Sequence, residues 1–153
     1  MSQTIREQII AALETRLKNY NWQQWDPDIF VGRSVFDPDV DPLPVLTILP
    51  SVEEAARTRY GTDQITMQVN LSGIVSLADG ASVTEDCEPI FGEMRKAAFS
   101  GGEIQIGTDY VAMAYTGGGI MDYPSELGPA IVTIGVILAI TYETNIGDPY
   151  NED

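Results

Sequence analysis

The clearest pattern along the chain is an alternation of apolar and polar side chains from Asp63 to Leu77. The apolar positions are Ile65, Met67, Val69, Leu71, Val75 and Leu77, and the polar positions are Gln64, Thr66, Gln68, Asn70, Ser72 and Ser76. A period of two predicts a β-strand that turns one face to the core and the other away from it. Gly73 interrupts the alternation, and a bend or a bulge is expected there.

A second long strand is predicted from Ala130 to Thr144, and both of its faces are apolar to some degree. One face carries Val132, Ile134, Val136, Leu138, Ile140 and Tyr142, and the other carries Ile131, Thr133, Gly135, Ile137, Ala139 and Thr141. A strand that is apolar on both faces is expected to be covered on both. Two helices in a chain this short can hardly cover both faces of its sheet, so partner subunits are a natural second cover.

Two segments have the spacing of apolar side chains that is typical of amphipathic helices. The first, Thr4–Tyr20, begins with a capping box formed by its threonine and Glu7. The second, Ser82–Phe99, begins with a similar pair, the serine and Glu85, and a Ser-Gly-Gly sequence follows its end. Pro89 lies past the first turn, so this helix either begins near Glu85 or is kinked.

Shorter elements complete the predicted domain. Short strands are expected at Phe30–Phe36, at Val45–Leu49 before Pro50, and at Tyr110–Thr116. Connections are expected at Asp37–Pro44, which is a rigid proline-rich turn, and at Glu53–Gly61 and Gly117–Pro129, which are loops. The sequence therefore predicts a single α+β domain over residues 1–153, with a mostly antiparallel sheet of four to five strands packed against two helices. A flexible acidic tail is expected from about residue 145.

The charge of the chain excludes several functional classes. The sequence has 23 acidic and 8 basic residues, a formal net charge of -15, no histidine and one cysteine, Cys87. Catalysis through Ser-His or Cys-His pairs and metal binding through histidine are therefore excluded. No basic patch is available for nucleic acid. A single cysteine cannot form an intramolecular disulfide. The longest uncharged apolar run, Leu127–Tyr142, is short for a membrane span. We therefore expect a soluble cytoplasmic protein without a membrane partner.

No motif in the sequence predicts a catalytic, cofactor-binding or metal-binding site. Asp37, Asp39 and Asp41 have the spacing that begins a calcium loop, but Pro42 and Ile48 stand where that loop needs glycine and glutamate.

Three other candidates have ordinary structural explanations. Gly117, Gly118 and Gly119 are not followed by the Lys-Ser/Thr pair of a phosphate-binding loop. The adjacent acids Glu85 and Asp86 suit the start of a helix, and Cys87 falls on an apolar helix stripe. We therefore expect a protein that is not an enzyme and that binds no cofactor.

The polar face of the strand from Asp63 to Leu77 is uncharged, which is unusual in a chain of this net charge. It is either an ordinary solvent-facing surface or a contact surface between subunits, from which charges are absent because they are costly to desolvate. Under the second interpretation, the candidate interface residues are Gln64, Thr66, Gln68 and Asn70, together with Asp37, Asp39, Asp41, Gly117, Gly118, Gly119 and Tyr123.

The order of the predicted elements resembles the tail terminator (tail completion) family of long-tailed bacteriophages, which includes the lambda minor tail protein U. The resemblance rests on three segments. They are Thr4-Ile-Arg-Glu-Gln-Ile-Ile-Ala-Ala-Leu13, Pro44-Val-Leu-Thr-Ile-Leu-Pro-Ser-Val-Glu-Glu54, and Thr133-Ile-Gly-Val-Ile-Leu-Ala-Ile-Thr-Tyr-Glu-Thr144 followed by Asp148-Pro149. Together they span nearly the whole chain, as a pattern of elements and not as a diagnostic motif.

The resemblance implies a structural virion protein. Members of this family form a ring, typically hexameric, on the end of the completed tail tube, where they stop tube growth and present a surface for joining the head. The implied partners are other copies of the chain, the tail tube protein and a head-completion or connector protein, while DNA passes through without specific binding. The implied location is the head-proximal end of the virion tail, assembled in the host bacterial cytoplasm.

Two alternatives remain open at the level of sequence. Another phage neck or connector component, or a tail tube subunit, would share most of these features. A carboxylate-based enzyme or a small-ligand binding domain is the alternative from a different class.

Overall fold

The computed structural model describes residues 3–32, 43–77, 82–106, 109–123 and 130–147. These residues form two helices and six strands. The helices are α1 (Ile5–Asn19) and α2 (Val83–Ala98), and the strands are β1 (Asp28–Val31), β2 (Val45–Arg57), β3 (Thr62–Leu77), β4 (Ile104–Ile106), β5 (Asp109–Tyr123) and β6 (Ala130–Asn145). The α+β class is as predicted.

The sheet differs from the predicted one in size and in strand direction. Its order is β1-β2-β3-β6-β5-β4, so it has six strands and not four to five. It is mixed, because β1 pairs with β2 in parallel while the other pairs are antiparallel. Strand β4 has three residues, which is too short for a periodic pattern in the sequence to reveal it.

Both helices are stabilised at their first turns as the sequence predicts. In α1, the Glu7 amide donates to Thr4 Oγ1 at 3.0 Å and the Thr4 amide donates to Glu7 Oε2 at 2.7 Å, which completes the capping box. In α2, the Glu85 amide donates to Ser82 Oγ at 3.2 Å, which is one of the two hydrogen bonds of the predicted capping box. This helix begins at Val83 and not near Glu85, and Pro89 lies inside it.

The central pair of strands is continuous. Strands β3 and β6 pair antiparallel from Thr62 opposite Asn145 to Leu77 opposite Ala130, without a break in register. This register gathers alternate apolar side chains on one face of both strands, and they are buried: Met67, Val69, Leu71, Val75, Val132, Ile134, Val136, Leu138 and Ile140. The alternation predicted for both strands is therefore confirmed.

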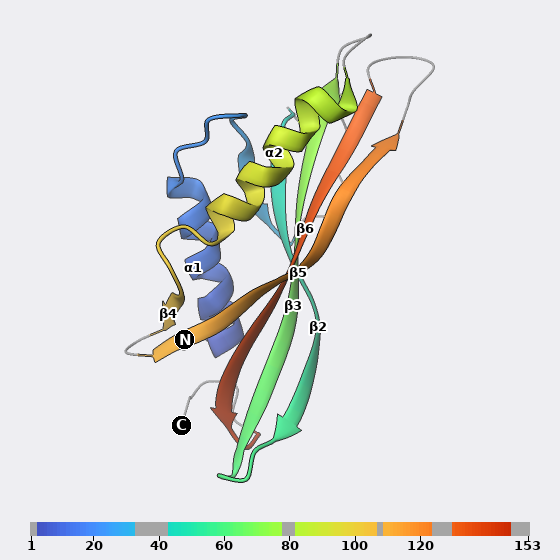
Figure 1. Ribbon diagram of the computed structural model, residues 1–153. Helices are drawn as coiled ribbons and strands as arrows, with labels where there is room; N and C mark the ends of the chain where they lie inside the picture. The colour runs from blue at the N-terminus through green and yellow to red at the C-terminus, as the bar shows by residue number, and fades with distance from the viewer. Residues whose placement is uncertain (1–2, 33–42, 78–81, 107–108, 124–129, 148–153) are drawn as a thin grey trace.

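Helices α1 and α2 lie on the same face of this strongly twisted sheet, and no described helix lies on the other face (Figure 1). Buried residues from α1 and α2 join the strand residues in one hydrophobic core. Ile5, Ile9, Leu13 and Leu17 recur on one side of α1, and Cys87 and Met94 lie on the buried side of α2. At the bottom of Figure 1, the hairpin of β2 and β3 extends past the first turn of α1.

Two predicted loops, Glu53–Gly61 and Gly117–Pro129, are strand in their first part, as far as Arg57 and Tyr123. Strand β2 continues through Pro50 to Arg57, with a register shift between Pro50 and Glu53, and β5 continues through the glycines to Tyr123, with a shift between Tyr115 and Gly117. Pro50 fits within β2 because β1 pairs with it no further than Ile48, so a missing N–H there interrupts no described ladder. Each bulge hides the period of two that would have indicated a longer strand.

Other predicted segments fall partly outside the described residues. The strand expected at Phe30–Phe36 is β1, which begins earlier and ends at Val31. The proline-rich turn lies outside the described residues except for its last two, and the expected acidic tail lies outside them beyond residue 147. The last strand ends at Asn145, one residue past its predicted end.

Gly73 marks a close contact between the sheet and the segment after α1, where a side chain would clash. A Cβ at Gly73 would lie 2.6 Å from Trp25 Cη2 and 3.1 Å from Met94 Sδ. The connection is fixed further by Glu93, which is 8% exposed and accepts hydrogen bonds from the Gln23 and Gln24 amides at 2.9 and 3.0 Å. The interruption of the alternation at this position is therefore a packing requirement.

We predict opposite effects on stability from alanine at two glycines. Gly73→Ala should lower the free energy of unfolding by about 1–3 kcal/mol, because the added methyl group overpacks the contact with Trp25. Gly92→Ala, in the exposed middle of α2 where a Cβ meets nothing within 4 Å, should raise it by about 0.5–1 kcal/mol. Urea unfolding of both variants measures these changes, and equal changes would contradict the packing argument.

Candidate functional site

The candidate functional site is the face of the sheet that the helices leave uncovered, which we call the open face. Cross-strand register assigns its side chains. They are Val45, Thr47, Leu49, Glu54 and Ala56 of β2, of which Val45 and Thr47 are buried; Gln64, Thr66, Gln68, Asn70, Ser72, Ile74 and Ser76 of β3; Ile131, Thr133, Gly135, Ile137, Ala139, Thr141 and Glu143 of β6; and Ala112, Ala114, Gly117 and Gly119 of β5. Among these described positions, the charged residues are Glu54 and Glu143, both at one end.

Polar groups on the open face bond to one another along the sheet. The hydroxyl groups of Thr66 and Thr141 lie 3.3 Å apart across β3 and β6, and Gln68 Nε2 donates to Asn70 Oδ1 at 3.1 Å. Because these groups already bond to one another, a partner that covers them would leave fewer buried polar groups without a hydrogen bond than if they had bonded only to water. Ile74, Ile131 and Ile137 are half-buried between them. The open face combines apolar area with polar groups that have partners already.

A trough of about 380 Å³ crosses the open face where glycines of two strands meet. Gly119 of β5 lies opposite Gly135 of β6. Asn70, Ser72 and Ile137 line the trough, and none of its lining residues is charged. The trough exists because neither glycine carries a side chain that would fill it.

Internal packing does not require these two glycines. A Cβ at Gly119 would meet nothing within 4 Å, and a Cβ at Gly135 would meet the Gly119 carbonyl oxygen at 3.9 Å, an ordinary contact. Gly118 differs, because a Cβ there would clash with the Gly135 carbonyl oxygen and crowd Phe91 of α2. The helix side of β5 therefore needs a glycine, whereas the open side tolerates a side chain.

The structure brings part of the predicted interface set together. Gln64, Thr66, Gln68 and Asn70 share the open face, as the alternation predicted. Gly117 and Gly119 lie on the same face two strands away, while Gly118 faces the helices. The expectation that the three glycines form a flexible loop is wrong, because they belong to β5.

The remaining predicted residues cannot be placed on a surface. Tyr123 pairs with Ile131 at the end of β5, and Asp37, Asp39 and Asp41 lie outside the described residues. Sequence reasoning missed the alanines of β5 and the part of β2 past Pro50. The semi-apolar second face of the last strand was the signal that could have led to them.

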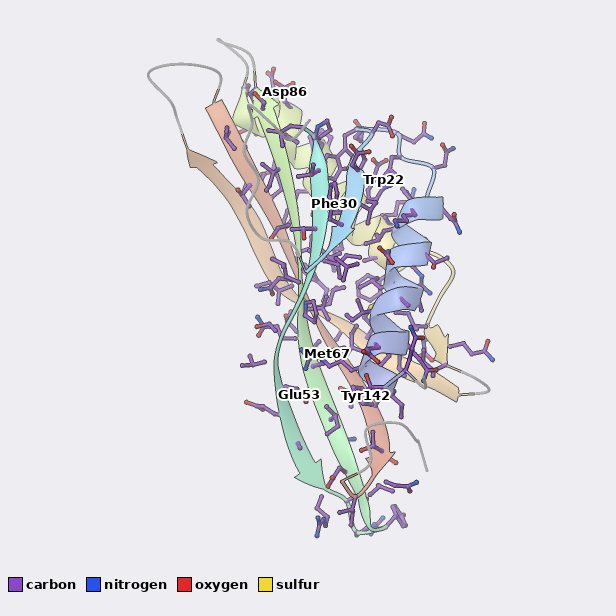
Figure 2. The ribbon with its side chains drawn as sticks, turned by 180° about the vertical axis from the view of Figure 1, so that it is seen from behind. Trp22, Phe30, Glu53, Met67, Asp86 and Tyr142 are labelled. Carbon is purple, nitrogen blue, oxygen red and sulfur yellow. The ribbon has the colours of Figure 1, made fainter. Side chains whose placement is uncertain are left out.

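Arg6 of α1 holds the helix to β2 through an ion pair and a hydrogen bond. Arg6 Nη1 lies 3.2 Å from Glu53 Oε2, Arg6 Nη2 donates to the Ser51 carbonyl at 2.8 Å, and Tyr142 OH donates to Glu53 Oε2 at 3.4 Å. Glu53 is the cross-strand partner of Met67, and Figure 2 shows the labelled Glu53 and Tyr142 in the same part of the sheet. Burial, followed by the negative charge of Glu53, raises the pKa of Tyr142 to about 12.

Beyond this cluster the β2–β3 hairpin is exposed and ends in a compact turn, Thr58–Gly61, which we call the tip. The hydroxyl groups of Thr58 and Thr62 lie 2.7 Å apart and close the turn. Tyr60 is 76% exposed, and the Arg59 guanidinium carbon lies 5.2 Å from the centre of its ring. Arg57 Nε lies 3.8 Å from Asp63 Oδ1 just behind the turn.

The described residues contain no group of three or more Cys, Asp or Glu side chains arranged to hold a metal ion. Within the same residues, no helix is long and apolar enough to cross a membrane. Cys87 lies on the buried side of α2, as its place on the apolar stripe of the sequence predicted. No protein-family model and no curated protein matches the chain.

We predict that Tyr142 makes stability depend on alkaline pH. Its pKa is raised from 10.0 to about 12 in the folded protein, so its stabilising effect is fully present below pH 10 and is lost as the pH rises through 12. The unfolding free energy of the wild type should therefore fall more steeply than that of Tyr142→Phe over this range. Denaturant unfolding at stepped pH measures the difference, and parallel curves for the two proteins would contradict it.

Proposed function

We propose that this protein is a structural component of a phage virion that forms a ring on the end of the tail tube. The ring terminates tail growth and provides the surface to which the head is joined. The proposal combines the element pattern that resembles the tail terminator family with the character of the open face. It assigns the protein no catalytic role.

The observation that carries the proposal is the near absence of charge on the open face of a chain with a net charge of -15. Like-charged copies repel one another, and charges buried in a contact are costly to desolvate. A contact between copies is therefore favoured where carboxylates are absent and half-buried isoleucines are present. The open face meets both conditions away from the end that carries Glu54 and Glu143.

A ring follows if the contact joins two different surfaces of the chain. Such a head-to-tail contact generates a closed ring when the rotation between copies closes. The ring would act by shape: one side matches the tail tube, and the other side does not accept another tube subunit. Acidic side chains towards the channel would let DNA pass without binding.

A neck or connector component, or a tube subunit, remains the nearest alternative, since each also assembles through neutral contact surfaces. Binding to preformed tail tubes distinguishes them, because a terminator stops tube elongation whereas a tube subunit extends it.

We predict that a carboxylate on the open face weakens self-association. Thr141→Glu should raise the dissociation constant of the oligomer at least about tenfold, because the new charge lies beside Glu143 and is desolvated in the contact. Thr84→Glu is the matched control, since Thr84 is exposed on the first turn of α2, where an acid is stabilised by the helix dipole. Sedimentation velocity over a concentration series measures both variants.

Two results would contradict the proposed function. One is a wild-type protein that stays monomeric both alone and with purified tail tubes. The other is tube elongation that continues at the same rate, in an assembly assay followed by negative-stain imaging, when the protein is added.

A further inference from the structure

We propose that Tyr60, at the tip of the β2–β3 hairpin of one copy, docks into the trough on the open face of a second copy. The inference rests on the proposed ring, and it names the two surfaces that would join there. The first is the tip, Thr58–Gly61, and the second is the glycine-floored trough of β5 and β6.

The trough has the form of a receiving site for a side chain. Its volume of about 380 Å³ exceeds the space of one aromatic side chain, and its floor is backbone at Gly119 and Gly135. Because a Cβ at Gly119 meets nothing inside the molecule, the space is not needed for the fold of the chain. Asn70, Ser72 and Thr133 at its edges offer hydrogen-bond partners for a phenol hydroxyl group.

The tip has the form of an anchor. Tyr60 is 76% exposed, and within the described residues its ring contacts Arg59. The turn is held by the paired hydroxyl groups of Thr58 and Thr62, so little conformational entropy would be lost on docking. Tyrosine and arginine are the residue types that, with tryptophan, most often dominate binding energy at protein interfaces.

Charge favours this pairing of surfaces. The tip carries Arg59 and no acid, while Arg57 just before it is paired with Asp63 at 3.8 Å. A second copy, with a net charge of -15, attracts the Arg59 guanidinium. The trough itself is uncharged, so Tyr60 enters without desolvating a charge while Arg59 stays at the rim.

The docking must join two copies. Thr62 begins β3 and Ser72 lies at the trough on the same strand, so the tip is separated from the trough by roughly 33 Å of extended chain. The stiff sheet between them cannot fold back on itself. Tip and trough are therefore two different surfaces of one chain, which is the arrangement that a head-to-tail ring requires.

Substitutions at each surface test the proposal. Tyr60→Ala and Gly119→Val should each raise the dissociation constant of the oligomer about tenfold or more, the first by removing the anchor and the second by filling the trough. Gly92→Ala, on the outer side of α2, is the control and should leave it within about twofold. Thermal unfolding confirms that each variant is folded.

Cysteine cross-linking locates the contact directly. The native Cys87 is fully buried, so introduced cysteines react without background. Arg59→Cys combined with Ser72→Cys, which keeps Tyr60, should give a ladder of disulfide-linked oligomers on non-reducing gels. Arg59→Cys combined with Gly92→Cys should give none, because Gly92 lies on the opposite side of the sheet.

The outcomes separate this inference from the proposed function. Weakened association in both Tyr60→Ala and Gly119→Val, with the ladder, supports the docking. A wild type that is oligomeric, with both variants unchanged and no ladder, overturns the docking and leaves the ring standing. A wild type that is monomeric alone and with tail tubes overturns both.

Discussion

The unbroken pairing of β3 with β6 is the constraint on which the rest of the structure depends. It runs from Thr62 opposite Asn145 to Leu77 opposite Ala130, so alternate residues of both strands stay on the same side over the whole length. One side supplies the buried surface on which α1 and α2 pack, and the other becomes the open face. A slip of one residue in this pairing would turn the core side chains to the open face and the open-face side chains to the core. The register therefore fixes both faces together. The bulges occur in β2 and β5, which flank this pair.

Most elements that depend on residues close together in the sequence could be predicted from it, whereas elements that depend on residues far apart in the sequence could not. Capping by Thr4 and Ser82 and the alternation in β3 and β6 are local patterns, and each predicts its element closely. The continuation of β2 past Pro50 depends on a residue pairing that is not local in the sequence. The proline is tolerated there because β1 ends beside Ile48. Strand β1 exists through its parallel pairing with β2, whereas β4 forms a hairpin of three residue pairs with β5, the next strand along the chain. Of the candidate site, the residues of β3 were predictable, whereas the trough depends on Gly119 and Gly135 meeting across two strands.

The distribution of charge connects the fold with the proposed assembly. The acids lie at positions where water or a specific partner compensates them, such as the first turn of α2, the Arg6–Glu53 contact and the amides that Glu93 accepts from. Among the described residues, the hydrophobic core cluster and the middle of the open face carry no acid, and the buried Glu93 accepts two backbone hydrogen bonds. A chain can therefore keep a large net charge, which opposes nonspecific association, and still present one neutral surface where a specific contact forms at little electrostatic cost.

The placement of the two tryptophans has a practical consequence. Trp22 and Trp25 pack edge to face, with ring centroids 5.7 Å apart, and Trp25 reaches Gly73 from the helix side of the sheet. Both indoles are thus separated by the sheet from the open face. Their intrinsic fluorescence reports the packing of helices on strands and is insensitive to what covers the other face. The molecule therefore carries a built-in optical signal for folding that is independent of assembly, so the two processes can be followed separately in one sample.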